Sequence, residues 1–94
     1  MTRIEFSPLM AASAPAYSPG VRSAQNITAT GTSQASTIEA DAGEYATILT
    51  DAAVYVAFGP APVASAANGR MVLANTVRDF GPLPAGTKVA VITV

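Results

Sequence analysis

Residues 44–59, EYATILTDAAVYVAFG, form the densest run of β-branched and aromatic side chains in the sequence. Side chains alternate with a period of two on either side of 50–52, which is the signature of a β-strand. In the first predicted strand, one face carries Tyr45, Thr47 and Leu49 and the other carries Ala46, Ile48 and Thr50. In the second, one face carries Val54, Val56 and Phe58 and the other carries Ala53, Tyr55 and Ala57. We therefore predict a hairpin that turns at 50–52. Because apolar residues occur on both faces, we also expect it to be covered on both sides.

Similar alternation continues on both sides of this predicted hairpin. Residues 21–30 and, more weakly, 34–39 precede it, and 70–75, 76–81 and 87–94 follow it. Turn-forming residues separate these segments at intervals of roughly 8–12 residues, and no window shows helical periodicity. The pattern predicts an all-β domain over 21–94, a small antiparallel β-sandwich or barrel of about seven strands.

The first 20 residues, MTRIEFSPLMAASAPAYSPG, differ in composition from the rest of the chain. Prolines remove backbone donors and disfavour a regular element, yet the segment carries apolar side chains that a flexible linker generally lacks. We predict that 1–20 is an extended N-terminal arm that lies across a neighbouring subunit, with a floppy tail as the alternative. The predicted partner-binding residues of the arm are Ile4, Phe6, Leu9, Met10 and Tyr17.

The sequence contains no histidine and no cysteine. Their absence removes the commonest general base, the commonest metal ligand, and every thiolate nucleophile or disulfide. The three carboxylates in 39–44 would offer oxygen ligands to Ca²⁺, but their spacing matches no calcium-binding loop, and we expect a solvated acidic turn instead. We predict that the protein is not an enzyme and has no catalytic residue, metal or cofactor.

Charged residues are few, with 5 basic against 6 acidic side chains, a net charge of −1 and 12% charged residues. An average soluble domain has about 25%. Binding to nucleic acid or to an anionic membrane needs clustered Lys and Arg, so neither partner is expected, and the five single basic residues are expected to be solvated. Apolar runs are too short for a membrane span, and Glu5 and Pro8 argue against a cleaved leader ending at Ala12-Ser13-Ala14. A surface with so few charges favours a homo-oligomer or a component of a larger assembly.

Residues 60–69, PAPVASAANG, form an uncharged segment that two prolines exclude from a central strand. We predict a surface loop that closes with a tight turn at Asn68-Gly69. Its predicted partner-binding residues are Pro60, Pro62 and Val63. Aromatic residues (Tyr45, Tyr55, Phe58 and Phe80) would suit a carbohydrate-binding platform, although aromatics spaced through a sandwich are more often part of its core.

From Tyr55 onward, the order of features resembles small virion proteins of tailed bacteriophages. These features are Tyr55-Val56-Ala57-Phe58-Gly59, the loop 60–69, Met71-Val72-Leu73, Phe80, Pro84-Ala85-Gly86 and Lys88-Val89-Ala90-Val91-Ile92. The resemblance covers roughly residues 33–94, and its motifs are strand ends and turns. Residues 1–20 are not part of it, although they resemble the extensions with which capsid cement proteins strap neighbouring subunits.

The resemblance implies a β-sandwich made in the host cytoplasm and assembled on the capsid exterior of the virion. Its partners would be the major capsid protein and further copies of itself in a symmetric homo-oligomer, which would be a trimer if the site on the particle is three-fold. The function implied is that of a capsid cement, or decoration, protein that binds between major capsid subunits and stabilises the head. A head–tail adaptor or fibre-anchoring module is the alternative, and a carbohydrate-binding β module is the alternative from another class.

Overall fold

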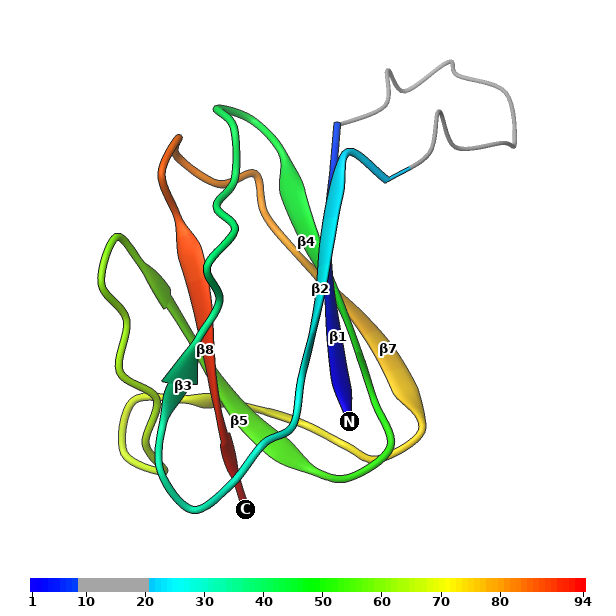
Figure 1. Ribbon diagram of the computed structural model, residues 1–94, viewed down its shortest axis with the longest axis vertical. Helices are drawn as coiled ribbons and strands as arrows, with labels where there is room; N and C mark the ends of the chain where they lie inside the picture. The colour runs from blue at the N-terminus through cyan, green and yellow to red at the C-terminus, as the bar shows by residue number, and fades with distance from the viewer. Residues whose placement is uncertain (9–20) are drawn as a thin grey trace.

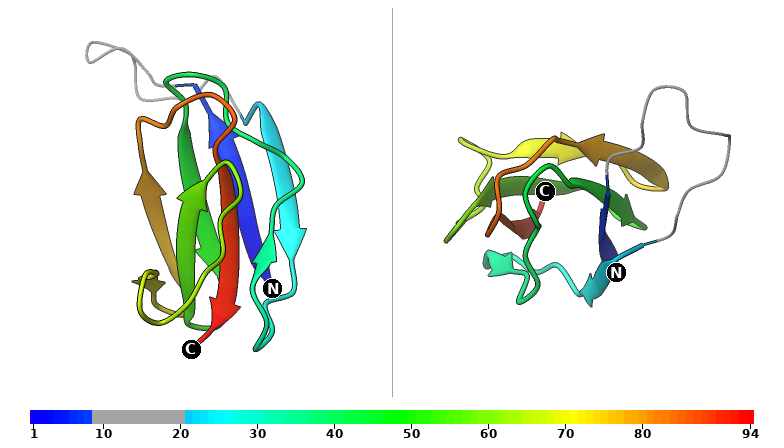
Figure 2. Two further views of the ribbon diagram at one scale, coloured as in Figure 1. Left: turned by 90° about the vertical axis from the view of Figure 1, so that its left-hand side faces the viewer. Right: turned by 90° about the horizontal axis from the view of Figure 1, so that it is seen from above.

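The computed structural model describes residues 1–8 and 21–94, which form two four-stranded antiparallel sheets packed face to face (Figures 1 and 2). The strands of sheet A, in spatial order, are β2 (Ser23–Ile27), β1 (Thr2–Ser7), β4 (Tyr45–Thr50) and β7 (Thr76–Phe80). Those of sheet B are β3 (Gln34–Ala35), β8 (Lys88–Thr93), β5 (Val54–Gly59) and β6 (Arg70–Val72). The prediction of a small all-β antiparallel sandwich is confirmed.

The strand β1 lies inside sheet A, hydrogen-bonded to β2 on one side and to β4 on the other. Ile4 and Phe6 have no exposed surface, whereas Arg3 points outward. The prediction of an extended arm is therefore wrong for Thr2–Ser7. The physical reason is the alternation of Thr2, Ile4 and Phe6 with polar residues, which suits a half-buried strand. The rest of the predicted arm, 9–20, lies outside the described residues.

The predicted hairpin over 44–59 is also wrong, because its two strands belong to different sheets. β4 pairs with β1 and β7, while β5 pairs with β6 and β8. The chain crosses from one sheet to the other at 51–53, so the buried faces of β4 and β5 oppose each other across the core. The alternation in each strand was predicted correctly, and Ile48, Val54 and Val56 are at most 1% exposed.

A second crossing connects β6 to β7 at 73–75, at the end of the segment 70–75 that the alternation had predicted as a strand. The two crossings are tied together, since the Asn75 amide donates to the Thr50 carbonyl at 2.8 Å. Asn75 has a φ of 59°, a left-handed conformation that asparagine tolerates better than most residues. The outer predicted strands are shorter than expected: 21–30 contributes only Ser23–Ile27, and 34–39 only Gln34–Ala35.

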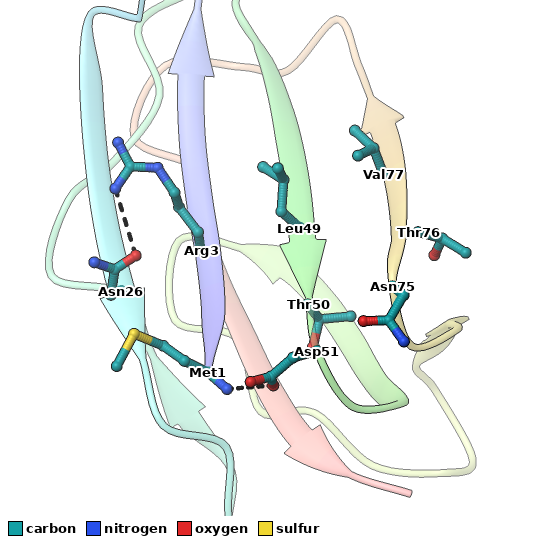
Figure 3. A pocket seen from close by; sticks show the side chains of 9 residues that line it. All are labelled: Met1, Arg3, Asn26, Leu49, Thr50, Asp51, Asn75, Thr76 and Val77. Atoms are coloured by element: carbon teal, nitrogen blue, oxygen red, sulfur yellow. Dashed lines mark hydrogen bonds and ion pairs between the residues drawn. The ribbon is translucent and has the colours of Figure 1, made fainter.

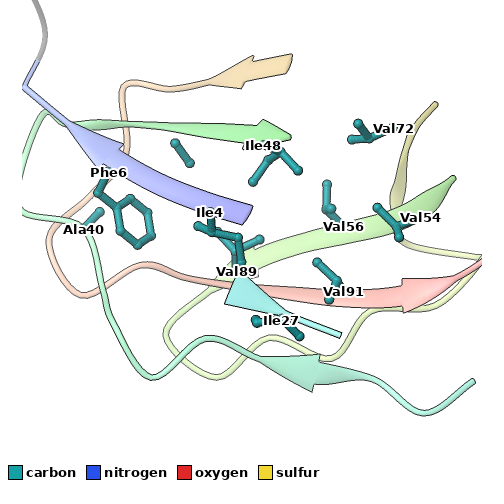
Figure 4. Packing of buried hydrophobic residues seen from close by; sticks show 11 residues of the cluster. Ile4, Phe6, Ile27, Ala40, Ile48, Val54, Val56, Val72, Val89 and Val91 are labelled. Carbon is teal, nitrogen blue, oxygen red and sulfur yellow. The ribbon is translucent and has the colours of Figure 1, made fainter. Parts of the chain in front are cut away.

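The core lies between the sheets and consists mainly of β-branched side chains (Figure 4). It contains Ile4, Phe6, Ile27, Ala40, Ala46, Ile48, Val54, Val56, Val72, Val89 and Val91. Burying a side chain of this size contributes about 1.5–3 kcal/mol relative to leaving it exposed. Phe6 is the largest fully buried side chain, so β1 supplies a substantial part of the hydrophobic stabilisation.

The two long sides of the sandwich differ. At the β2–β3 side, the inward-facing Gln25 side chain spans the layers: its oxygen accepts hydrogen bonds from the backbone amides of Thr37 at 2.8 Å and Ile38 at 3.3 Å. At the β6–β7 side, Arg70 and Arg78 occupy inward-facing positions, directly across the ladder from the buried Val56 and Ile48 respectively. One side is therefore closed by hydrogen bonds and the other is bordered by charge.

Candidate functional site

The outer face of sheet A carries an open hollow of about 480 Å³ near the beginning of β1 (Figure 3). Its floor is one row of side chains that crosses all four strands, in the order Asn26, Arg3, Leu49 and Val77. Its rim is formed by Met1, Thr50, Asp51, Asn75 and Thr76. The register alone produces this row, because residues directly opposite each other in neighbouring strands point to the same face.

The charges in the hollow are already paired within the molecule. The Arg3 guanidinium donates to the Glu5 carboxylate at 2.6 Å and reaches the Asn26 side-chain oxygen at 3.5 Å. At the rim, the Met1 ammonium group pairs with Asp51 and holds the pKa of that carboxyl below its ordinary value. The hollow therefore combines the apolar Leu49 and Val77 with charges that already have partners within the molecule.

Two of the predicted partner-binding residues, Ile4 and Phe6, are fully buried in the core and are unavailable to a partner in this fold. Three others, Leu9, Met10 and Tyr17, lie outside the described residues. The remaining three (Pro60, Pro62 and Val63) lie together on the loop 60–69, where the Val63 side chain is 67% exposed. The structure thus brings the predicted loop residues together and separates them from Ile4 and Phe6, which lie in the core.

The loop 60–69 packs against part of the outer face of sheet B. A row of small residues crosses that face, Ala35, Ala90 and Ala57, and Ala90 has no exposed surface although it points away from the core. Ala64 of the loop is 2% exposed, and its amide donates to the Ser33 hydroxyl at 2.8 Å. Small side chains allow the loop backbone to approach the sheet closely. The loop therefore has a buried side against sheet B and an outward side that presents Val63.

Hydrogen bonds within the loop fix its shape. The Asn68 side chain accepts from the Ser65 amide at 2.9 Å and donates to the Val63 carbonyl at 2.9 Å. The Gly69 amide donates to the Ser65 carbonyl at 2.8 Å, so the turn lies at 66–68 rather than at the predicted Asn68-Gly69, and neither of these two residues has a positive φ. A Cβ atom at Gly69 would lie 2.7 Å from the Tyr55 Cβ, so glycine is required there by close approach.

The acidic turn 39–44 was predicted to be solvated. This prediction is wrong for Glu44, whose side chain is only 4% exposed. Its carboxylate accepts from the Arg22 guanidinium at 2.7 Å and from the Asp41 amide at 2.7 Å. Arg22 also lies 3.1 Å from the Asp41 carboxylate and donates to the Glu39 carbonyl at 2.8 Å. The hydrogen bond from Arg22 holds the pKa of Glu44 below its ordinary value, and burial opposes this effect without cancelling it. Arg22 was expected to be a solvated basic residue, but its guanidinium has structural partners in the turn 39–44.

The sequence raised two alternatives for a ligand site, a calcium site in the turn 39–44 and a carbohydrate-binding platform of aromatic side chains. Within 1–8 and 21–94, no group of three or more acidic side chains is placed to hold a metal ion. The four aromatics considered for a carbohydrate platform do not form one surface: Tyr45 points outward from sheet A and Tyr55 outward from sheet B. The other two, Phe58 and Phe80, contact each other with ring centroids 5.0 Å apart and pack against the core.

Sequence reasoning missed a group of exposed apolar side chains on the β6–β7 segment. Met71 is 42% exposed, Leu73 59% and Val77 60%. Alternation placed them in strands, but both strands lie at the edge of their sheets, and Leu73 lies in the crossing between them. An alternation pattern does not distinguish edge strands from central strands, so the exposure of these three side chains, which lie on different faces of the sandwich, had no signal in the sequence.

Comparisons with protein-family models, with curated proteins and with solved structures gave no match to this chain. The part of the chain that the structure describes contains no helix that is long and apolar enough to cross a membrane.

Proposed function

We propose that this protein is a structural component of a tailed-bacteriophage particle, a capsid cement protein that binds between major capsid subunits. The resemblance of residues 33–94 to small virion proteins carries this proposal. The features of that resemblance have ordered positions in the fold: Phe58-Gly59 ends β5, and Pro84-Ala85-Gly86 precedes β8.

The surface of the protein supports a binding role of this kind. The loop 60–69 is uncharged, is fixed by its own hydrogen bonds and presents Val63 outward. Because the loop is already ordered, little conformational entropy is lost when it contacts a partner. Exposed apolar side chains on an ordered surface, with few charges to desolvate, suit a permanent contact in an assembly.

The mechanism is mechanical and requires no reaction. Each copy buries apolar surface across the boundary between capsid subunits, and this burial contributes about 25 cal/mol per Å² before the cost of association. The contact is repeated by the symmetry of the shell. The sum over copies resists the outward pressure of packaged DNA.

The test compares phage heads that contain the protein with heads assembled without it. Heads without it are expected to release their genome at a lower temperature in a DNA-accessibility melting assay, because the boundaries between capsid subunits are then less strongly held. Equal release temperatures would refute the cement function.

A matched pair of variants tests the loop as the contact surface. Val63→Glu is expected to reduce occupancy on heads, whereas Val77→Glu, at a similarly exposed valine on sheet A, is expected to leave it unchanged. The reverse pattern would move the capsid contact to the hollow on sheet A. Quantified copy number distinguishes the alternative, since a head–tail adaptor is present at one vertex and a cement protein over the whole shell.

A further inference from the structure

The four edge strands of the sandwich are protected to different degrees against pairing with another chain. An exposed edge presents unpaired backbone groups and is a template for a further strand, and proteins commonly block it with short strands or inward-pointing charges. In sheet B, both edges are short: β3 has 2 residues and β6 has 3. In sheet A, both edges, β2 and β7, have 5 residues.

The β6–β7 side is blocked by two inward-pointing arginines. Arg70 lies opposite Val56, and Arg78 lies opposite Ile48, so both occupy positions that face the core side of their sheets. Arg78 is held over the Phe80 ring, with its guanidinium carbon 5.4 Å from the ring centroid. A strand added beside β7 would place its own inward side chain next to this guanidinium and would remove the charge from water.

The β2 edge has no such device. The segment from Ser23 to Thr30 contains no charged residue, no proline and no glycine. Within 1–8 and 21–94, β2 pairs with β1 alone. The outward-pointing side chains of β2, Ala24 and Asn26, are both exposed. Of the two long edges, only β2 therefore lacks a charged residue.

We propose that β2 is a self-association edge at which a second copy of the chain pairs through its own β2. A two-fold axis perpendicular to sheet A makes the two strands antiparallel and keeps the buried faces of both copies on one side. This symmetry allows Gln25 to lie opposite the partner subunit's Gln25, which places Ala24 opposite the partner subunit's Asn26. Sheet A then continues across the axis into the sheet of the second copy.

The charges beside β2 favour this register over its neighbours. Asn26 continues the row that contains Arg3, and Ala24 continues the row that contains Glu5. With Gln25 at the centre, the row of Arg3 continues through Asn26 and the partner subunit's Ala24 to the partner subunit's Glu5, about 14 Å away over three strand spacings, so charges of opposite sign share each row. Centring on Asn26 instead would align the two Arg3 rows, and centring on Ala24 would align the two Glu5 rows. Self-pairing of β7 would add a second inward arginine beside the first.

The experiment uses the purified full chain in sedimentation-velocity ultracentrifugation over a range of concentrations. The wild type is expected to reach twice the 9.5 kDa mass of one chain. The double variants Ala24→Lys/Asn26→Lys and Ala24→Glu/Asn26→Glu are each expected to stay at the mass of one chain, because like charges lie directly opposite each other. An equimolar mixture of the two is expected to recover the double mass, because every Lys then lies opposite a Glu.

Thermal unfolding of each variant checks that the fold is intact. Tm is expected to stay close to that of the wild type, because both substituted side chains are exposed. A wild type that stays at the mass of one chain, or that forms a trimer, overturns the proposal. Variants that remain dimeric overturn it as well, and a mixture that fails to pair overturns the Ala24–Asn26 register. The purified protein alone is measured, so these outcomes do not depend on the phage-head experiments.

Discussion

Replacing Phe6 by alanine tests whether the N-terminal strand is part of the hydrophobic core. Phe6 has no exposed surface and is the largest fully buried side chain. Truncation of a buried phenylalanine to alanine costs about 3–5 kcal/mol, because the transfer free energy of the ring is lost and a cavity remains. A domain of 94 residues has a total free energy of unfolding of about 5–14 kcal/mol. The substitution should therefore remove about a fifth of the stability or more.

Urea unfolding followed by circular dichroism measures this loss. A loss of 3 kcal/mol corresponds to a fall in Tm of at least about 12 °C for a domain of this size. The matched control is Arg3→Ala on the same strand, whose outward side chain is 44% exposed and whose loss should change stability by no more than about 0.5 kcal/mol.

The two variants separate a core strand from an arm. If residues 1–8 were an arm that strapped a neighbour, Phe6→Ala would leave the unfolding of the isolated domain as unchanged as Arg3→Ala does. Equal urea midpoints for the two variants would refute the placement of β1 in sheet A. Deletion of residues 1–7 extends the test: it removes the strand between β2 and β4, and the shortened chain is expected to lose cooperative unfolding.

Three further predictions follow from the fold. Gly69→Ala should lower Tm, because its Cβ would lie 2.7 Å from a backbone oxygen and from a tyrosine Cβ, whereas Gly31→Ala, with nothing within 4 Å, should be neutral in the same melting experiment. The pKa of Glu44 is lowered in the folded state, so its contribution to stability is present above the ordinary glutamate pKa of 4.5 and is lost as the pH falls through the lowered value. The urea midpoints of wild type and Glu44→Gln should therefore differ at neutral pH and converge in acid, and a constant difference would contradict this linkage. Arg70→Val/Arg78→Val should produce species larger than the wild type in light scattering, because the β6–β7 side of the sandwich loses its inward charges. An unchanged mass would show that other features block the β6 and β7 edges.

The fold class and the buried faces were predictable from the sequence, but the strand pairing was not. Period-two alternation identified the inward residues of β4 and β5, including Ile48 and Val54, because burial on one face leaves a local pattern. Pairing depends on contacts between distant residues: β1 binds β4 across more than 40 positions, as in the register of Ile4 with Ile48. Adjacent strands with a short connection suggest a hairpin, and the same connection serves equally well as a crossing between sheets.

The strand β1 was missed although its alternation is visible in the sequence. The prolines that follow Ser7 gave the whole segment 1–20 the appearance of an arm, and a boundary drawn at residue 20 hid the six-residue strand inside it. Of the exposed candidate surfaces, only the loop 60–69 was predicted from the sequence. Exposed Leu73 and Val77 and inward-pointing Arg70 and Arg78 violate the rule of apolar inside and polar outside. Residues that violate the pattern at sheet edges are a recurring sign of interaction or of its prevention.

The burial of Ile4 and Phe6 changes how a cement role would be carried out. A strap made of residues 1–8 would have to leave sheet A, and that would expose the largest buried side chain and break the hydrogen bonds of β1 to both neighbours. Binding to a shell is then expected to use a surface that is already formed, the loop 60–69, while the β2 edge is taken up by the second copy of the chain. Preformed surfaces contact a partner without unfolding any part of the domain, so binding and folding should be separable. Val63→Glu should weaken attachment to heads without changing Tm, and Phe6→Ala should lower Tm first and attachment only as a consequence.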